Sequence, residues 1–277
     1  MTLTERNNIS IAQIVIYVPS LFVAIWLAIR HGFGRNAGWF YLIVFSLARV
    51  IGSALQLATI SDPKNISLYI GSIILQSIAL SPLILVQIAL IGRAVKTIQG
   101  SAVSFVTENR LRLVQLLTLV GMILGAVGGS NSSSSLSETG KYTASSLSQA
   151  GIGLTIAAYV LLVIATAVVA QQISQVQPGE KRLVLAVGLS LPFILVRLAY
   201  SAESVFGHNP DFSQYSGNSN ILLGMAVIME MIVVAIVEGI GMSLNKGPKT
   251  RVAAATSSGY QQPWQQAEAD HEMGGYK

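Results

Sequence analysis

Seven apolar runs divide the chain, and each is long enough to cross the hydrocarbon core of a bilayer. A spanning helix needs about 20 apolar residues. Only 10% of the residues are charged, against about 25% in a soluble domain. The sequence therefore predicts an all-α, polytopic integral membrane protein, a seven-helix transmembrane bundle. The expected spans are residues 10–30, 38–60, 67–92, 111–129, 150–173, 183–206 and 220–244.

Lysine and arginine predict the orientation of this bundle, because cytoplasmic loops carry an excess of both. Only Arg6, Lys64 and Lys141 lie in the connections at the N-terminal side. We therefore expect the N-terminus outside, a membrane domain over residues 1–245, and a disordered cytosolic tail over 246–277. The residues on the cytosolic side are Arg30, Arg35, Arg93, Lys96, Arg110, Arg112, Lys181, Arg182, Lys246, Lys249, Arg251 and Lys277.

The net charge of +5 thus follows from topology, and no nucleic-acid partner is expected. The sequons at Asn8, Asn65 and Asn131 all fall on the predicted outer side, and Asn131 is the preferred glycosylation acceptor. Asn131 belongs to a Ser/Thr-rich stretch, residues 130–149, which is predicted to be a mobile outer loop.

Composition excludes several chemistries. The chain has no cysteine, and its three histidines fall outside the expected spans, so neither a thiolate site nor an intramembrane metal site is expected. Residues 220–244 contain no lysine for a retinal Schiff base, and no span contains the aspartates of an intramembrane aspartyl protease. No cofactor is expected.

Small residues and prolines shape the expected helices. Gly121, Gly125 and Gly129 recur every four residues on one helix face, a spacing that lets another backbone approach closely. Pro82 and Pro192 lie inside spans, where they free backbone carbonyls and allow kinks.

Polar residues within the spans are the candidate site, because an ionised side chain at mid-bilayer costs roughly 2.5–3.5 kcal/mol or more. Antiparallel packing of the last two spans could set Arg197 opposite Glu230 or opposite a polar group nearer the outer side, and Arg49 could then take the other acid. The group serves to lock helices together, to bind a headgroup or other anion, or to carry protons through Glu230 and Glu238. Its members are Arg49, Gln76, Arg197, Glu203, Glu230 and Glu238.

Short motifs add a resemblance to known proteins. The runs Ile74–Ser77, Ser81–Leu83 and Gly92–Arg93 are similar to the third helix of the fungal lipid-translocating exporter-like proteins. The run Leu195–Glu203 resembles their sixth helix, with an arginine followed by an acid. The match is closer to fungal seven-helix proteins of an unknown-function domain family, in which a glutamate such as Glu230 recurs in the seventh helix.

The resemblance implies a fungal protein of the plasma membrane or another secretory-pathway membrane. The function expected first is non-enzymatic binding or translocation of an amphipathic lipid-like molecule, with membrane lipids as further partners. One alternative is a receptor-like sensor whose basic inner loops, residues 93–112 among them, recruit an effector. Another is an intramembrane enzyme, such as an acid-initiated cyclase with Glu230 as proton donor.

Overall fold

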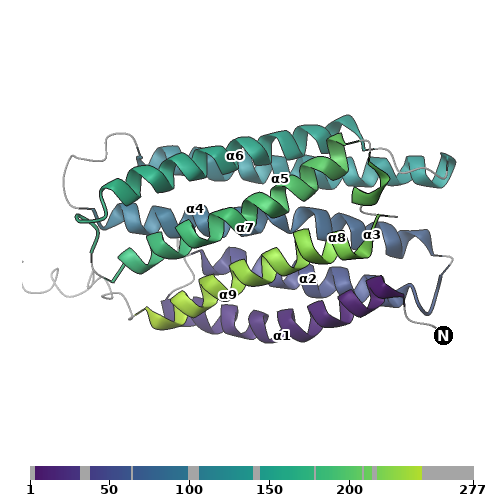
Figure 1. Ribbon diagram of the computed structural model, residues 1–277, viewed down its shortest axis with the longest axis horizontal. Coiled ribbons are helices and arrows are strands. Elements are labelled where there is room, and N and C mark those ends of the chain that lie inside the picture. Colours follow the sequence, from purple (N-terminus) through teal and green to yellow (C-terminus); the bar gives the residue numbers. More distant parts are fainter. Residues whose placement is uncertain are drawn as a thin grey trace, which may run out of the picture. The chain divides into compact units, whose positions relative to one another are not determined.

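The computed structural model describes residues 4–31, 38–63, 65–98, 106–139, 144–177, 179–207, 209–213 and 217–244. Arg35, Lys64, Lys141 and the tail 246–277 lie outside these ranges. The described regular elements are all helical (Figure 1), namely α1 (Glu5–His31), α2 (Trp39–Ala58), α3 (Ile66–Ile78), α4 (Leu80–Lys96), α5 (Glu108–Thr139), α6 (Ser146–Gln171), α7 (Lys181–Phe206), η2 (Pro210–Phe212), α8 (Ser219–Ile221), η3 (Leu222–Val227) and α9 (Ile228–Ser243).

These elements form seven helical stretches long and apolar enough to cross a membrane, which confirms the predicted fold class. The third stretch combines α3 with α4, and the seventh combines α8, η3 and α9. The helix breaks at Ala79 because the ring of Pro82 clashes with the carbonyl group four residues earlier. The turn η3 is π-helical and ends three residues before Glu230.

The helices run up and down the bundle, so alternate connections share one end. We call the end where α1 begins the N-terminal end and the opposite one, with Arg93, Lys96 and Arg182, the basic end. Which end faces the cytosol stays a prediction from the lysine and arginine distribution. Helix α4 is the central element, since it is buried over most of its length and packs against α2, α5, α6 and α7.

Helix α1 buries its polar face and exposes its apolar face, the reverse of a surface helix in a soluble protein. Its buried face carries Asn7, Ser10, Gln13, Tyr17 and Ser20, at spacings of three and four residues. A helix in water turns such a face outward, whereas hydrocarbon leaves polar groups no partner outside the protein. The side chains that α1 exposes instead are Ile11, Val15, Ile16, Phe22, Trp26 and Ile29.

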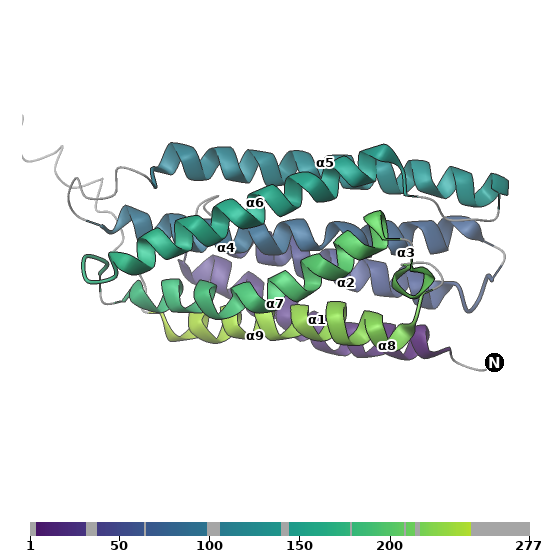
Figure 2. The same ribbon diagram turned by 45° about the horizontal axis from the view of Figure 1, so that its top comes forward.

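Glycines bring α5 and α6 together where α6 begins, and the two helices diverge from there (Figure 2). A Cβ atom built at Gly151 of α6 would lie 2.7 Å from the nitrogen of Gly125 and 2.8 Å from the carbonyl oxygen of Gly121. A Cβ at Gly129 would lie 3.2 Å from Ile74 of α3. The three glycines singled out from the sequence therefore lie in contacts within this chain.

The predicted outer loop over residues 130–149 is shorter than expected, because α5 continues to Thr139 and α6 begins at Ser146. Ser145 caps α6 by accepting a hydrogen bond from the Ser148 amide, and its hydroxyl donates to the carbonyl of Gly128 on α5. These local bonds offset the poor helix propensity of serine. Asn131, the predicted glycosylation acceptor, is exposed on α5.

Replacing Gly151 with alanine is expected to lower the free energy of unfolding by about 1–3 kcal/mol, because the new methyl group overpacks the α5–α6 contact. Gly153→Ala is the matched control, since nothing lies within 4 Å of a Cβ there. That variant should match the parent or gain up to about 1 kcal/mol from helix propensity. Thermal unfolding in detergent, followed by tryptophan fluorescence, measures both. Equal losses for the two variants would contradict the packing described.

Candidate functional site

Two arginines and one glutamate from three helices form a buried cluster at mid-depth in the bundle. Arg49 of α2 and Arg197 of α7 are each 2% exposed, and Glu230 of α9 is 0% exposed. Arg197 donates from Nε to Oε1 of Glu230 at 2.6 Å. The Nη2 group of Arg49 donates to the same carboxylate. We call these three residues the charge cluster.

The remaining donors of Arg197 are also occupied. Its Nη1 group donates to the hydroxyl of Ser201, one turn further along α7, and its Nη2 group donates to the carbonyl oxygen of Gln76 at 3.2 Å. Gln76 lies in the last turn of α3, where carbonyl groups lack helical partners. The break before Pro82 therefore supplies an acceptor for Arg197.

Aromatic rings complete the surroundings of both guanidinium groups. Arg49 lies 5.8 Å from the ring centre of Phe45, and Arg197 lies 5.7 Å from that of Tyr200. Such cation–π contacts favour a desolvated cation. The hydroxyl of Tyr17 is buried nearby and has no hydrogen-bond partner among the described residues, and the same holds for Nε of Arg49.

The charges of the cluster do not cancel. Both arginines pair with the same acid, so two cations share one anion in a region of low dielectric. This differs from the expectation that Arg49 takes another acid. Breaking a buried ion pair costs roughly 3–5 kcal/mol because it leaves an uncompensated charge. The cluster thus holds three helices together and still carries an excess positive charge.

The other predicted site residues lie elsewhere. Glu203 is exposed near the end of α7. Glu238 lies two turns along α9 from Glu230 and accepts a hydrogen bond from Ser20 of α1 at 2.5 Å. Ser20 is in turn 3.4 Å from the hydroxyl of Ser46 on α2. Gln76 meets the cluster through its backbone.

A layer of neutral polar side chains covers the charge cluster on the N-terminal side. The hydroxyl of Ser53 donates to Oε1 of Gln13 at 2.7 Å, and Ser72 donates to Oε1 of Gln56 at 3.2 Å. Nε2 of Gln13 is buried without a partner among the described residues. The sequence analysis did not single out Gln13, Tyr17 and Ser20. Their spacing of four and three residues places them on one face of a helix, and this pattern could have identified them.

Two cavities lie above this layer. The N-terminal vestibule has a volume of about 600 Å³ and is lined by residues that include Asn7, Tyr69 and Ser219. The polar pocket beneath it holds about 20 Å³, enough for one water molecule. Arg6 and Gln56 line both. The pocket is lined by Arg6, Ile9, Ser10, Gln13, Gln56, Ser72, Ile73, Gln76 and Leu222.

The donor set of this region suits an anion. No three histidine, aspartate or glutamate side chains come together within the described part of the chain, so no metal-ligand set is present there. The pocket instead offers the guanidinium of Arg6 and the unpaired amide of Gln13. Gln13 lies one turn from Tyr17 and Ser53 one turn from Arg49, about 6 Å along the helices.

The fold and the cluster define a multi-pass membrane protein with a buried ion cluster and, on one side of it, a polar layer and two cavities. Residues 3–247 match the family model described as domain of unknown function DUF7702. The chain belongs to this family. No curated protein and no solved structure matches it.

Removing the shared acid should harm the protein more than removing either cation. Glu230→Gln leaves two unpaired arginines and is expected to cost roughly 3–5 kcal/mol of unfolding free energy. Arg49→Met leaves one balanced pair and should cost clearly less. Glu203→Gln, the same change at an exposed site, should stay within about 0.5 kcal/mol of the parent. Thermal unfolding in detergent ranks the variants, and a larger loss for Arg49→Met than for Glu230→Gln would refute the shared-acid geometry.

Proposed function

We propose that this protein binds the anionic head of an amphipathic, lipid-like molecule that enters from the N-terminal end. The excess positive charge of the cluster carries the proposal. Two buried arginines share one carboxylate, and a polar cavity opens above them. One oxygen atom of the head group, in place of the water molecule that fits the polar pocket, would lie within a few turns of both arginines, where low dielectric strengthens its attraction to them.

The vestibule suits the entry of such a head. Its wall carries one acid, Glu5, and one cation, Arg6, and it joins the wall of the polar pocket at Arg6 and Gln56, so the cation lies where the two cavities meet. Nη2 of Arg6 donates to the carbonyl of Gly217 at 2.8 Å, which holds the side chain at the junction. In the predicted orientation this vestibule faces the outside of the cell or the lumen of a secretory organelle.

Binding, and not passage, is the function we propose for this conformation. Below the charge cluster the bundle is closed by apolar side chains that are fully buried, namely Ala24, Leu27, Trp39 and Leu42. Translocation would require these side chains to separate. Two guanidinium groups pair with Glu230, which supports a role as their counter-ion over the alternative role as the proton donor of a cyclase.

Dodecyl phosphate is a suitable probe, with zwitterionic dodecylphosphocholine as its matched control. We expect dodecyl phosphate to raise the free energy of unfolding of the protein in phosphatidylcholine nanodiscs by about 2.7 kcal/mol at a hundredfold excess over Kd, seen as a higher unfolding temperature. Dodecylphosphocholine at the same concentration should not stabilise the protein. Gln13→Leu should weaken binding about tenfold, since a hydrogen bond to a charged group contributes about 1.5–3 kcal/mol.

Gln149→Leu provides the control variant, because Gln149 is exposed at the same end and lines neither cavity. It should bind dodecyl phosphate like the parent. Equal binding by Gln13→Leu and the parent would refute the proposed pocket, and equal stabilisation by both probes would refute the preference for an anion.

A further inference from the structure

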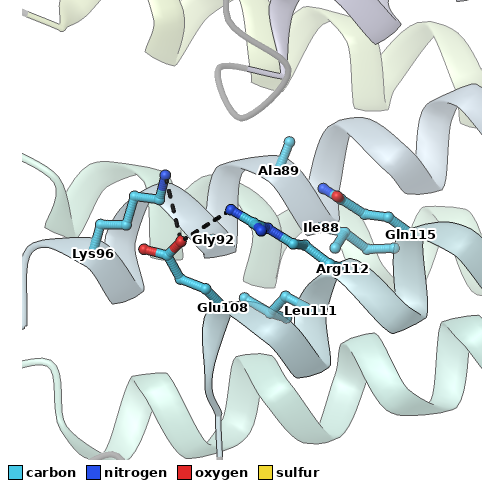
Figure 3. A pocket seen from close by; sticks show the side chains of 8 residues that line it. All are labelled: Ile88, Ala89, Gly92, Lys96, Glu108, Leu111, Arg112 and Gln115. Carbon is cyan, nitrogen blue, oxygen red and sulfur yellow. Dashed lines mark ion pairs between the residues drawn. The ribbon is translucent and has the colours of Figure 1, made fainter.

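A second charged hollow lies between α4 and α5 at the basic end, at the opposite end of the bundle from the vestibule. Figure 3 shows it: Lys96 ends α4, Glu108 begins α5, and Arg112 follows one turn later. Like the polar pocket, it has a cavity volume of about 20 Å³. None of its residues belongs to the charge cluster or to the N-terminal cavities.

The two cations of the hollow converge on one point. Lys96 Nζ lies 3.8 Å and Arg112 Nη2 lies 3.7 Å from the same oxygen of Glu108, Oε2 (Figure 3). The position of this oxygen is therefore one that two cations can reach together. With one carboxylate for two cations, the hollow keeps a net positive charge.

A neighbouring pair shows what a structural ion pair looks like at this end. Arg93 of α4 donates from Nε and Nη2 to one oxygen of Glu180 at 3.1 and 2.7 Å, and both side chains are less than one-fifth exposed. The side chains of Lys96, Glu108 and Arg112 are 38%, 42% and 62% exposed. Such loose, exposed pairs contribute little to stability. Glu108 is accordingly easy to displace.

The other side chains that line the hollow are apolar except for Gln115, and Gly92 lies among them (Figure 3). Ile88, Ala89 and Leu111 line it towards the middle of the bundle. A Cβ at Gly92 would be 3.6 Å from Leu111, an ordinary contact, so alanine fits there and a larger side chain would fill the hollow. Cations at a helix end beside apolar walls match an amphiphile with a charged head and an acyl chain.

We propose that the hollow between Lys96 and Arg112 binds the phosphate group of an anionic phospholipid, with the Glu108 carboxylate occupying that position in its absence. The phosphate oxygens take the place of Glu108 Oε2 between the two cations. The first carbons of the lipid lie beside Gly92, which is partly exposed. Glu108 then lowers the affinity for the lipid by competing with it.

Variants with opposite expected signs test the proposal by native mass spectrometry of the full chain, titrated with dioleoyl phosphatidic acid or dioleoyl phosphatidylcholine. Phosphatidic acid should bind more tightly. Arg112→Gln should weaken its binding about fivefold, the effect of one cation near a membrane surface. Glu108→Gln should strengthen binding because it removes the competitor. Weaker binding by Glu108→Gln would contradict the proposal that the Glu108 carboxylate competes with the lipid phosphate for this position.

Arg110→Gln is the matched control, because it makes the same charge change two residues away, outside the hollow. A loss equal to that of Arg112→Gln would show only general surface attraction and overturn the site. Gly92→Leu should weaken binding with all charges kept, while Gly92→Ala should retain it. If Gly92→Leu does not fold, the difference in phosphatidic acid binding between Arg112→Gln and Arg110→Gln still tests the site.

Two further measurements distinguish lipid binding at this hollow from binding of free phosphate and from binding at the N-terminal end. Excess inorganic phosphate should not displace phosphatidic acid, since it lacks the acyl chain, and full displacement would overturn a lipid site. Gln13→Leu, which alters the polar pocket at the other end, should bind phosphatidic acid like the parent. A loss in that variant would assign the binding to the vestibule and overturn the site proposed here.

Discussion

The arrangement of this bundle depends on keeping Arg49, Arg197 and Glu230 away from hydrocarbon. Each ion alone would cost several kcal/mol in the middle of a bilayer. Together they bind one another, and the break between α3 and α4 adds a carbonyl acceptor for Arg197. Helices α2, α7 and α9 are therefore fixed at one level of the bundle by a single carboxylate.

Helix α1 extends this interior towards both ends. Its polar stripe meets Ser53 above the cluster and Glu238 below it, through Gln13 and Ser20. The stripe ends at Ala24 and Leu27, where the packing becomes apolar. The interior of the bundle is thus polar and hollow on the N-terminal side of the charge cluster and apolar on the other side of it. That asymmetry suits a protein that receives a charged head from one side.

The sequence predicted the architecture well because its dominant signal is local. An apolar run of about 20 residues admits few folds, and Pro82 marked the break in the third span. The structure also placed Arg197 opposite Glu230, as antiparallel helices suggested. The extension of α5 to Thr139 was missed, because a serine-rich composition indicates a loop.

The membership of the polar site was harder to predict. Depth along a helix follows from residue counts, but rotation about the helix axis does not. Glu203 and Glu238 had suitable depths, yet Glu203 is exposed and Glu238 meets Ser20. That Arg49 shares Glu230 with Arg197 depends on how α2 is placed beside α9. The cavities likewise form from several helices, and no single stretch encodes them.

Spin labels on α2 measure directly whether its polar face is turned into the protein, and the absence of cysteine makes single-site labelling clean. Collision with oxygen, which concentrates in lipid, should be most frequent at Leu47 and Ile51, both exposed, and least frequent at Ser46 and Ser53, both buried. A water-soluble nickel complex should reach Gln56 in the vestibule. Frequent oxygen collisions at Ser46 and Ser53, with protection at Leu47 and Ile51, would place the face of Arg49 in lipid and contradict the buried charge cluster.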